Sequence, residues 1–181
     1  MLCGSFLTHA APQTYKIDPA HTYPSFEADH MGISTWRGKF NESAGVVILD
    51  REASTGTLDI VIAVDSVDFG HNLMNNVARS AQMFDAERFP QARYEGELTE
   101  FVEGVPTRVA GRLTLRGITL PLNLTLERFR CITHPLLRRE VCGADASGQF
   151  NREDYGIELG KWLGFAMEVG LRIQVEAILQ N

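Results

Sequence analysis

The histidines and carboxylates are the residues of this chain best suited to acid–base or metal chemistry. The sequence has 5 histidines and 23 aspartate or glutamate residues, yet it contains no G-x-S-x-G, no H-E-x-x-H and no glycine-rich phosphate loop. His21 and His30 flank one predicted strand region, but their spacing of nine residues places them on opposite faces of a regular strand. The sequence therefore predicts neither an enzyme nor a metal site.

The segment "NREDYGI" brings Arg152 and Asp154 close together in the sequence. A turn held by local hydrogen bonds explains this pattern better than a catalytic dyad does. The triplet "NLT" at 123–125 matches a glycosylation acceptor. Because it lies within a predicted strand, we expect it to remain unmodified.

Cys131 and Cys142 bracket a short segment, "CITHPLLRREVC", between two strand-like stretches. A disulfide closing this loop would stabilise the fold by about 2 to 3 kcal/mol in the chain-entropy model, and it indicates an oxidising compartment. Two free thiols are an alternative. Metal ligation by Cys131, His134 and Cys142 is a third, although the spacing matches no common zinc pattern. We expect the disulfide.

The first twelve residues, "MLCGSFLTHAAP", contain no acidic residue and end in small residues, as a signal-peptide cleavage region does. They are too few for a whole signal peptide, so we expect residues 1–12 to be a signal-peptide remnant or a disordered tail. Cys3 is a poor candidate for a lipid anchor because Leu2 stands where a small residue is expected.

The length and charge of the chain limit its class. The 181 residues contain no linker rich in Pro, Gly or Ser, which predicts a single domain over residues 13–181. The net charge of -6 argues against nucleic-acid binding, which depends on Lys and Arg neutralising phosphates. No segment approaches the roughly 20 apolar residues of a membrane-spanning helix. We expect a soluble protein.

The elements that position these residues are mostly strands. In "GTLDIVIAVDSVDF", Leu58, Ile60, Ile62 and Val64 share one apolar face. In 111–129 the alternation loses step at Arg116-Gly117, which predicts a hairpin turn there. Strand-like patterns occupy 14–17, 25–30, the segments on both sides of 41–43, 57–64, 92–101, 107–115, 118–129 and 167–178.

One segment, "NLMNNVARSAQMFDAERFP", breaks the strand pattern. Leu73, Met74, Val77, Ala81 and Phe84 form an approximate helical stripe, which predicts one or two short helices before Pro90. Many antiparallel strands with one helical interruption predict a mainly β fold, either a sandwich or a closed barrel of about eight strands. A barrel removes exposed edges and has room for one small ligand. Periodicity does not show whether side chains fill its interior.

A series of motifs in order resembles the bacterial YceI-like polyisoprenoid-binding family over residues 14–178. The motifs are "YKIDPAHT", "FEADHMG", "GKF", "DSVD", "RSAQMFDAERFPQARYEG", "GRLTLRGITLPL", "FNREDYGI" and a terminal "LRIQVEA". The resemblance implies an extended, antiparallel, lipocalin-like β-barrel that is exported to the periplasm. It implies a hydrophobic tunnel for a polyisoprenoid, such as the tail of a ubiquinone-like quinone, or another long amphiphile. It also implies that a homodimer is common and that no catalytic cofactor is needed.

A dry tube is sufficient for such a ligand because each buried methylene contributes about 0.8 kcal/mol. We expect the helical segment to cover one tunnel mouth with Met74, Val77, Met83, Phe84 and Phe89, and His30 to be either a polar cap or a headgroup contact. The residues expected to face the interior, as packing or as ligand contacts, are Phe26, Ala28, Phe40, Val46, Ile48, Ile60, Ile62, Leu113, Leu115, Leu122, Leu124, Phe150, Leu171 and Ile173.

The chain departs from the family pattern at one place. Where the family often carries Arg-Asp, one residue and His-Leu, this sequence reads Met74-Asn75, Asn76 and Val77-Ala78. Apolar and amide groups replace charged and imidazole groups. We therefore expect a different headgroup or a more apolar entrance.

An interaction module is the alternative to a lipid carrier. In that case the barrel is filled by its own side chains, and an exposed patch of Trp36, Trp162, Leu163 and Phe165 contacts a partner such as a membrane redox protein. The interior distinguishes the two hypotheses. A tunnel of roughly 300 to 1,000 Å³ favours the carrier, and a filled interior favours the module.

Overall fold

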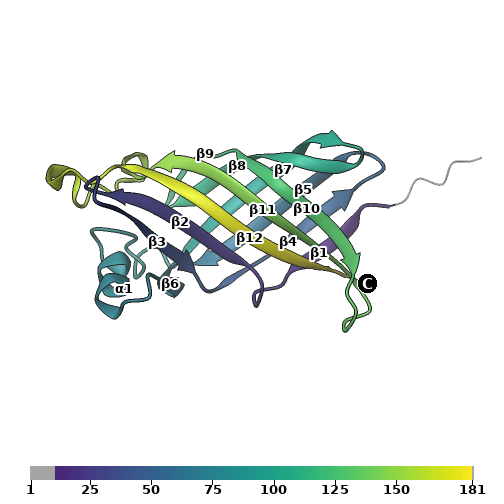
Figure 1. Ribbon diagram of the computed structural model, residues 1–181, viewed down its shortest axis with the longest axis horizontal. Helices are drawn as coiled ribbons and strands as arrows, with labels where there is room; N and C mark the ends of the chain where they lie inside the picture. The colour runs from purple at the N-terminus through teal and green to yellow at the C-terminus, as the bar shows by residue number, and fades with distance from the viewer. Residues whose placement is uncertain (1–10, 181) are drawn as a thin grey trace, which may run out of the picture.

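A computed structural model of the protein describes residues 11–180 and shows a long, closed, antiparallel β-barrel with a short helix at one end (Figure 1). The barrel is a ring of eight strands, as the sequence predicted. In ring order the strands are β1 (Gln13–Ile17), β4 (Ser43–Asp50), β5 (Thr55–Ala63), β7 (Gln91–Val102), β8 (Val105–Leu115), β10 (Leu124–Thr133), β11 (Glu140–Asn151) and β12 (Glu168–Leu179).

Strand β1 closes the ring because it pairs with β4 on one side and with β12 on the other. Tyr15 lies opposite Val47 in the first pairing and opposite Leu179 in the second. Each ring strand therefore has a neighbour on both sides. Closure of this kind removes the unpaired edges that promote aggregation.

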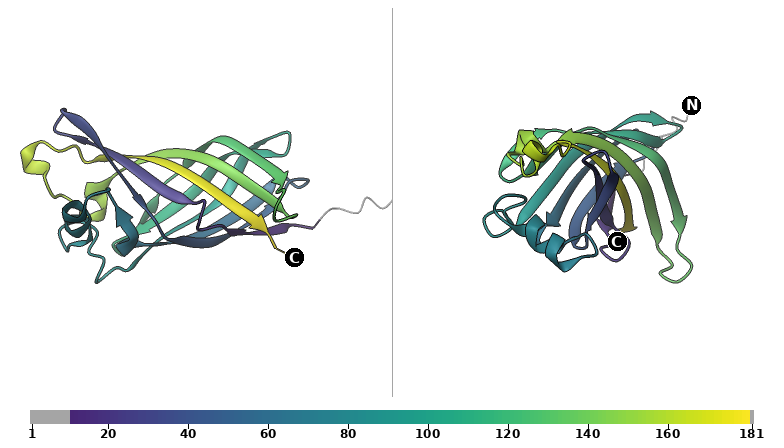
Figure 2. Two further views of the ribbon diagram at one scale, coloured as in Figure 1. Left: turned by 60° about the horizontal axis from the view of Figure 1, so that its bottom comes forward. Right: turned by 60° about the vertical axis from the view of Figure 1, so that its left-hand side comes forward.

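A second set of strands extends the barrel at one end. β2 (Tyr23–His30) pairs with Val169–Gln174 of β12, whereas β1 pairs with Ala177–Leu179 of the same strand. β3 (Ser34–Phe40) pairs with β2, and the short β6 (Val67–Asp68) pairs with β3. Figure 2 shows that the β2–β3 hairpin reaches past the ring at the end that carries the helix.

The helical elements of the described residues are short. They are η1 (Val64–Ser66), α1 (Asn72–Arg79), η2 (Arg152–Tyr155) and η3 (Lys161–Leu163). One α-helix forms where one or two were expected, and residues 81–89 form turns in which Phe84 N–H donates to Ala78 and Phe89 N–H donates to Asp85. The predicted stripe is partly wrong, because Leu73 and Ala81 are exposed while Ala78 is buried.

The predicted hairpin turn at Arg116-Gly117 is confirmed. Both residues have positive φ, 51° and 75°, which is the type I′ geometry that glycine favours. The strand expected over 118–129 is instead two strands, β9 (Ile118–Pro121) and β10, separated by Leu122 and Asn123. Pro121 has no N–H to donate to a ladder, and the carbonyl of Leu122 accepts a hydrogen bond from the hydroxyl of Tyr94 at 2.9 Å.

The disulfide is confirmed. Cys131 and Cys142 lie directly opposite each other in the β10–β11 ladder, with their Cα atoms 4.0 Å apart, and their sulfur atoms are bonded. The two alternatives, free thiols and metal ligation by these cysteines, are therefore excluded. The bond joins two ring strands near the end of the barrel that lies opposite α1 (Figure 1).

The N-terminal prediction cannot be compared with the fold, because the expected tail of residues 1–12 lies outside the described residues except for Ala11 and Pro12. Among residues 11–180, no helix is long and apolar enough to cross a membrane.

Candidate ligand-binding cavity

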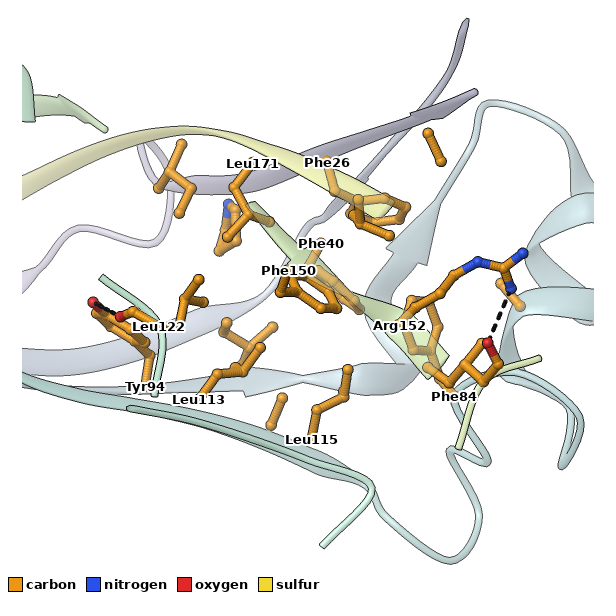
Figure 3. A pocket seen from close by; sticks show the side chains of 18 of the residues that line it. Phe26, Phe40, Phe84, Tyr94, Leu113, Leu115, Leu122, Phe150, Arg152 and Leu171 are labelled. Carbon is orange, nitrogen blue, oxygen red and sulfur yellow. Dashed lines mark hydrogen bonds between the residues drawn. The ribbon is translucent and has the colours of Figure 1, made fainter. Parts of the chain in front are cut away.

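The interior of the barrel contains a cavity of about 440 Å³ (Figure 3). Alternation along the strands directs one face of each strand into it. On β5 these residues are Leu58, Ile60 and Ile62, and on β12 they include Leu171 and Ile173. The side chains leave this volume unfilled, and it falls within the range of small-molecule sites.

Most of the predicted interior residues do line the cavity, whether or not a ligand contacts them. They are Phe26, Ala28, His30, Phe40, Ile60, Ile62, Met74, Val77, Met83, Phe84, Leu113, Leu115, Leu122, Leu124, Phe150, Leu171 and Ile173. They come from strands on all sides of the barrel and from the segment around α1. The sequence therefore predicted much of the cavity wall, both on the strands and on the segment around α1.

The prediction for β4 was wrong. Val46 and Ile48 are 40% and 42% exposed, whereas Val47 lines the cavity and Leu49 is buried. Four apolar residues in succession fit either face, so alternation alone does not choose between them. The pairing of Val47 with the buried Tyr15 decides the register.

The prediction for Phe89 was also wrong. Its ring lies beside Gly117 of the β8–β9 turn and under the guanidinium of Arg88, 5.1 Å from the ring centroid, and does not line the cavity. The turns after α1 place Met83 and Phe84 over the cavity instead. A periodic helix would have extended the stripe to Phe89, but residues 81–89 are not helical.

Several cavity residues were not predicted. Leu58 and Val175 carry the same alternation as their predicted neighbours and were recognisable from it. Tyr94 was recognisable too, because it alternates with charged residues on the same face as Ala92 and Leu98. Its packing against a glycine of the next strand was not. A Cβ at Gly111 would lie 2.2 Å from the Tyr94 hydroxyl, so the absence of a side chain makes room for the ring.

Arg152 also lines the cavity and was not predicted to do so. It is only 7% exposed, and its guanidinium donates to the backbone carbonyls of Ala166 at 3.3 Å, Ile157 at 3.3 Å and Leu159 at 2.9 Å. Burial lowers the pKa of Arg152. Because the carbonyls occupy its donors, Arg152 fastens the loop around η3 to the barrel. The predicted turn is present as η2, where the side chain of Asn151 accepts a hydrogen bond from the N–H of Glu153 at 3.0 Å.

An aromatic cluster marks the end of the cavity near η3. The ring of His30 stacks on Trp36 with centroids 4.1 Å apart, and Phe165 meets His30 edge-on at 4.6 Å. All three line the cavity. Trp162, which lines it too, is 83% exposed. The cavity therefore opens to solvent here.

Apolar residues of α1 form part of the cavity wall at the place where the sequence departs from the family pattern. Met74 and Val77 line the cavity. Asn75 turns away from it: its Oδ1 accepts from Phe69 N–H at 2.7 Å, and its Nδ2 donates to Asp68 at 3.0 Å. Asn75 therefore holds α1 against β6.

The opposite end of the barrel is filled. Tyr15, Leu49 and Leu98 are buried and belong to the core, but they do not line the cavity. The hydroxyl of Tyr15 donates to Glu140 at 2.5 Å, and Arg51 donates to both groups. Burial is the largest cause that raises the pKa of Tyr15 to about 12. This polar network and the core beneath it close the cavity at this end.

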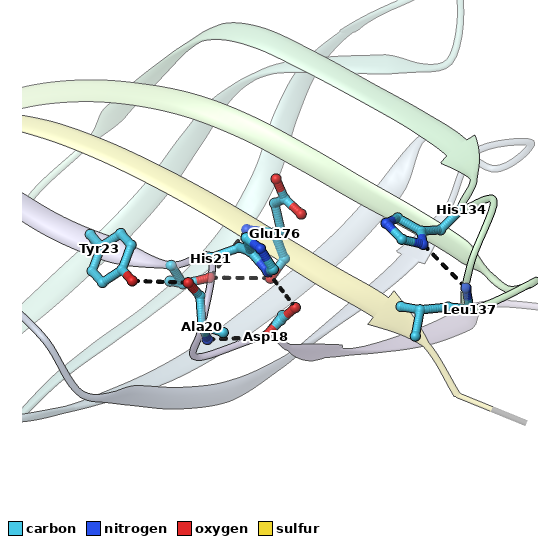
Figure 4. A network of polar contacts seen from close by, with 8 residues as sticks. Asp18, Ala20, His21, Tyr23, His134, Leu137 and Glu176 are labelled. Carbon is cyan, nitrogen blue, oxygen red and sulfur yellow. Dashed lines mark hydrogen bonds and ion pairs between the residues drawn. The ribbon is translucent and has the colours of Figure 1, made fainter.

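His21 lies away from the cavity, in the turn between β1 and β2 (Figure 4). Its Nδ1 is 2.8 Å from a carboxylate oxygen of Asp18. The hydrogen bond lowers the pKa of Asp18 and raises that of His21. The structure does not bring His21 and His30 together, since His30 contacts Trp36 and Phe165 instead.

Among residues 11–180, one group of potential metal ligands lies close together, namely Cys131, Glu140 and Cys142. Both cysteines are in the disulfide and have no thiolate to offer. This group therefore does not form a metal site.

A closed antiparallel barrel around an apolar cavity with one open end defines a lipocalin-like barrel. The chain belongs to the YceI-like domain family, whose model matches residues 15–177. It is 30% identical over 177 residues to the proteins named YceI from Salmonella arizonae and Salmonella paratyphi B, covering 95% of this chain and 90% of each relative.

Solved structures share the fold. BcnA of Burkholderia cenocepacia superposes with a TM-score of 0.69 at 20% identity, covering 88% of this chain and 98% of that one. A polyisoprenoid-binding domain from Saccharophagus degradans, implicated in plant cell wall breakdown, superposes with a TM-score of 0.63 at 15% identity, covering 93% of this chain and 99% of that one.

Proposed function

We propose that this protein binds one long isoprenoid lipid of the quinone or polyprenyl type, or a similar amphiphile, and sequesters or transports it without chemical change. The observation that carries the proposal is the apolar cavity of about 440 Å³, closed at one end and open at the other. An isoprenoid chain suits such a site because its binding free energy comes from the burial of apolar surface. The polyisoprenoid-binding neighbour from Saccharophagus degradans supports the same class of ligand.

The shape of the cavity indicates how the ligand lies. The inner part is lined by aliphatic side chains such as Leu113, Leu122 and Ile173, which suit a hydrocarbon tail. The open end carries His30, Trp36 and Asp29, whose polar groups suit a headgroup. The tail therefore enters first, and the headgroup stays near the aromatic cluster.

We further propose that residues 13–181 form the lipid-binding domain, that residues 1–12 are a leader remnant or tail, and that the protein works in the periplasm. The disulfide supports this location, since disulfides persist in oxidising compartments. Formation of a homodimer and contact with a membrane redox protein remain predictions.

The direct test is native mass spectrometry of protein purified from a periplasmic extract, followed by organic extraction and identification of the released molecules. We expect one isoprenoid lipid per chain. Protein at its bare mass that also fails to bind quinones or polyprenols added afterwards would contradict the proposal.

A variant that fills the cavity tests its location. Ala146 on β11 is 7% exposed and lines the cavity, so Ala146→Phe places a ring where the ligand tail lies. We expect at least a tenfold loss of lipid affinity, equivalent to about 1.4 kcal/mol. The matched control is Ser147→Phe, which adds the same ring to the outer face of the strand, where Ser147 pairs with the exposed Arg172. Equal affinity of the two variants would place the ligand elsewhere.

A further inference from the structure

Five large apolar side chains are exposed around the open end of the cavity. They are Met31 at 44%, Ile33 at 77%, Leu73 at 64%, Trp162 at 83% and Leu163 at 45% exposure. We call these five residues the mouth rim. They come from the β2–β3 turn, α1 and the η3 loop, which lie at the same end of the molecule in both views of Figure 2.

One ring contact and a common cavity wall link these three segments. His30 at the end of β2 meets Phe165 after η3 at 4.6 Å, which joins the β2–β3 hairpin to the η3 loop. Met74 and Val77 of α1 line the same cavity as Trp162 and Leu163. The mouth rim is thus continuous with the cavity: two of its members are both wall and outer surface.

Two ion pairs lie next to the mouth rim. Lys161 of η3 forms an ion pair with Glu153, and Arg37 of β3 forms one with Glu27 at 3.2 Å. Asp29 accepts a hydrogen bond from the N–H of Gly32 at 2.8 Å. These two ion pairs therefore add no net charge beside the opening.

We propose that the mouth rim docks the barrel on the surface of a lipid bilayer, so that the cavity opens directly into the lipid phase. This inference rests on the proposed function, because an isoprenoid chain resides in a membrane before a carrier takes it up. Trp162 suits this role since indole rings favour the boundary between headgroups and acyl chains. Apolar side chains that insert shallowly give reversible attachment, as a carrier requires.

The test is binding to unilamellar phosphatidylcholine vesicles, measured by flotation. Ile33→Ser combined with Leu73→Ser removes two members of the mouth rim that do not line the cavity. We expect this double variant to bind vesicles at least about tenfold more weakly than the unmodified protein. The matched control removes two exposed apolar side chains from the opposite end, Val102→Ser with Leu136→Ser, which are 61% and 86% exposed in the unmodified protein. Its binding should stay within about twofold.

The fluorescence of Trp162 reports how the protein is oriented on the vesicle. Phosphatidylcholine with brominated acyl chains quenches the fluorescence of an indole that enters the bilayer, so quenching is expected in the unmodified protein and should be largely lost in Trp162→Phe. Binding should also change little with salt, because paired charges contribute no net attraction. Absence of vesicle binding, equal losses in both double variants, or no quenching of Trp162 would overturn the proposal.

Binding of a quinone with a short isoprenoid tail, added from solution without vesicles, separates this inference from the proposed function. If the quinone binds and the vesicles do not, docking is wrong and the carrier function stands. If neither this quinone nor a polyprenol added in the same way binds, the carrier function fails. The Ile33→Ser and Leu73→Ser double variant should bind the quinone like the unmodified protein, since neither residue lines the cavity.

Discussion

At the scale of single residues, the polar and ionisable side chains that could be read as catalytic have structural partners. Arg152 donates to three carbonyls, and Asn75 joins Asp68 to the backbone of Phe69. His21 is held by Asp18. These contacts fix turns and loops around the barrel.

The pair of Asp18 and His21 makes stability depend on pH. The raised pKa of His21 means that its contribution is complete below the ordinary histidine pKa of about 6.5 and is lost as the pH rises through the folded-state value. The lowered pKa of Asp18 means that its contribution is present above about pH 3.9 and is lost as the pH falls through the folded-state value.

We therefore expect His21→Gln to lower the Tm slightly at a pH of about 5.5 and to have almost no effect at a pH of about 9, in thermal unfolding followed by circular dichroism. The control is His71→Gln, an exposed histidine before α1 whose side chain does not cap the helix. A decrease in Tm that is the same at both pH values would contradict this origin.

Some residue roles can be predicted from the alternation of apolar and polar residues, and others depend on tertiary contacts. Leu113, Leu124 and Ile173 were recognisable because alternation marks one face of a strand. The role of Arg152 was not, because it needs carbonyls from a loop that the sequence does not place. The packing of the Tyr94 ring over Gly111 was not recognisable either. Local periodicity carries no information about such contacts.

At the scale of elements, the sequence predicted most of the ring strands and the hairpin at Arg116-Gly117, but it gave no range for β11 and did not predict every boundary. The segment 118–129 alternates throughout, yet a hydrogen bond from Tyr94 on another strand interrupts it at Leu122. In β4 the run from Val46 to Leu49 fits both faces, so its pairings with β1 and β5 set the register. Both errors arise from tertiary contacts.

The disulfide connects two elements, β10 and β11, across a turn. Replacing Cys131 and Cys142 by Ala removes the constraint on the unfolded chain and should lower the free energy of unfolding by about 2 to 3 kcal/mol in the chain-entropy model. Urea denaturation measures the change. Reducing agent should bring the unmodified protein to the stability of the double variant and leave the variant itself unchanged. If reduction does not alter the midpoint of the unmodified protein, the bond does not contribute to stability.

At the scale of the whole molecule, the structure combines a filled end and an open end in one barrel. The core around Tyr15, Leu49 and Leu98 stabilises the fold without a ligand, and the cavity leaves apolar surface that a ligand can cover. Any molecule that binds only the folded state raises its stability by mass action. Occupancy of the cavity and stability of the barrel are therefore linked.

Removal of bound lipid by organic extraction and refolding should consequently lower the Tm. Adding the identified lipid back at about 100 times its Kd should raise the free energy of unfolding by about 2.7 kcal/mol. Differential scanning calorimetry measures both steps. Ala146→Phe, whose new ring occupies the cavity, should show at the same lipid concentration a shift of no more than about 1.4 kcal/mol. An equal shift in this variant would mean that the lipid acts at another site.

The pairing of β1 with β12 also has a consequence for folding. Tyr15 lies opposite Leu179, so the contact that completes the ring joins segments separated by nearly the whole described chain. Such a high contact order makes loop closure slow and places the folding time in the range of about milliseconds to seconds. Until β12 is in place there is no lumen, and the apolar faces of the other strands are open to solvent. The cavity is therefore enclosed only once the two ends of the described chain have paired.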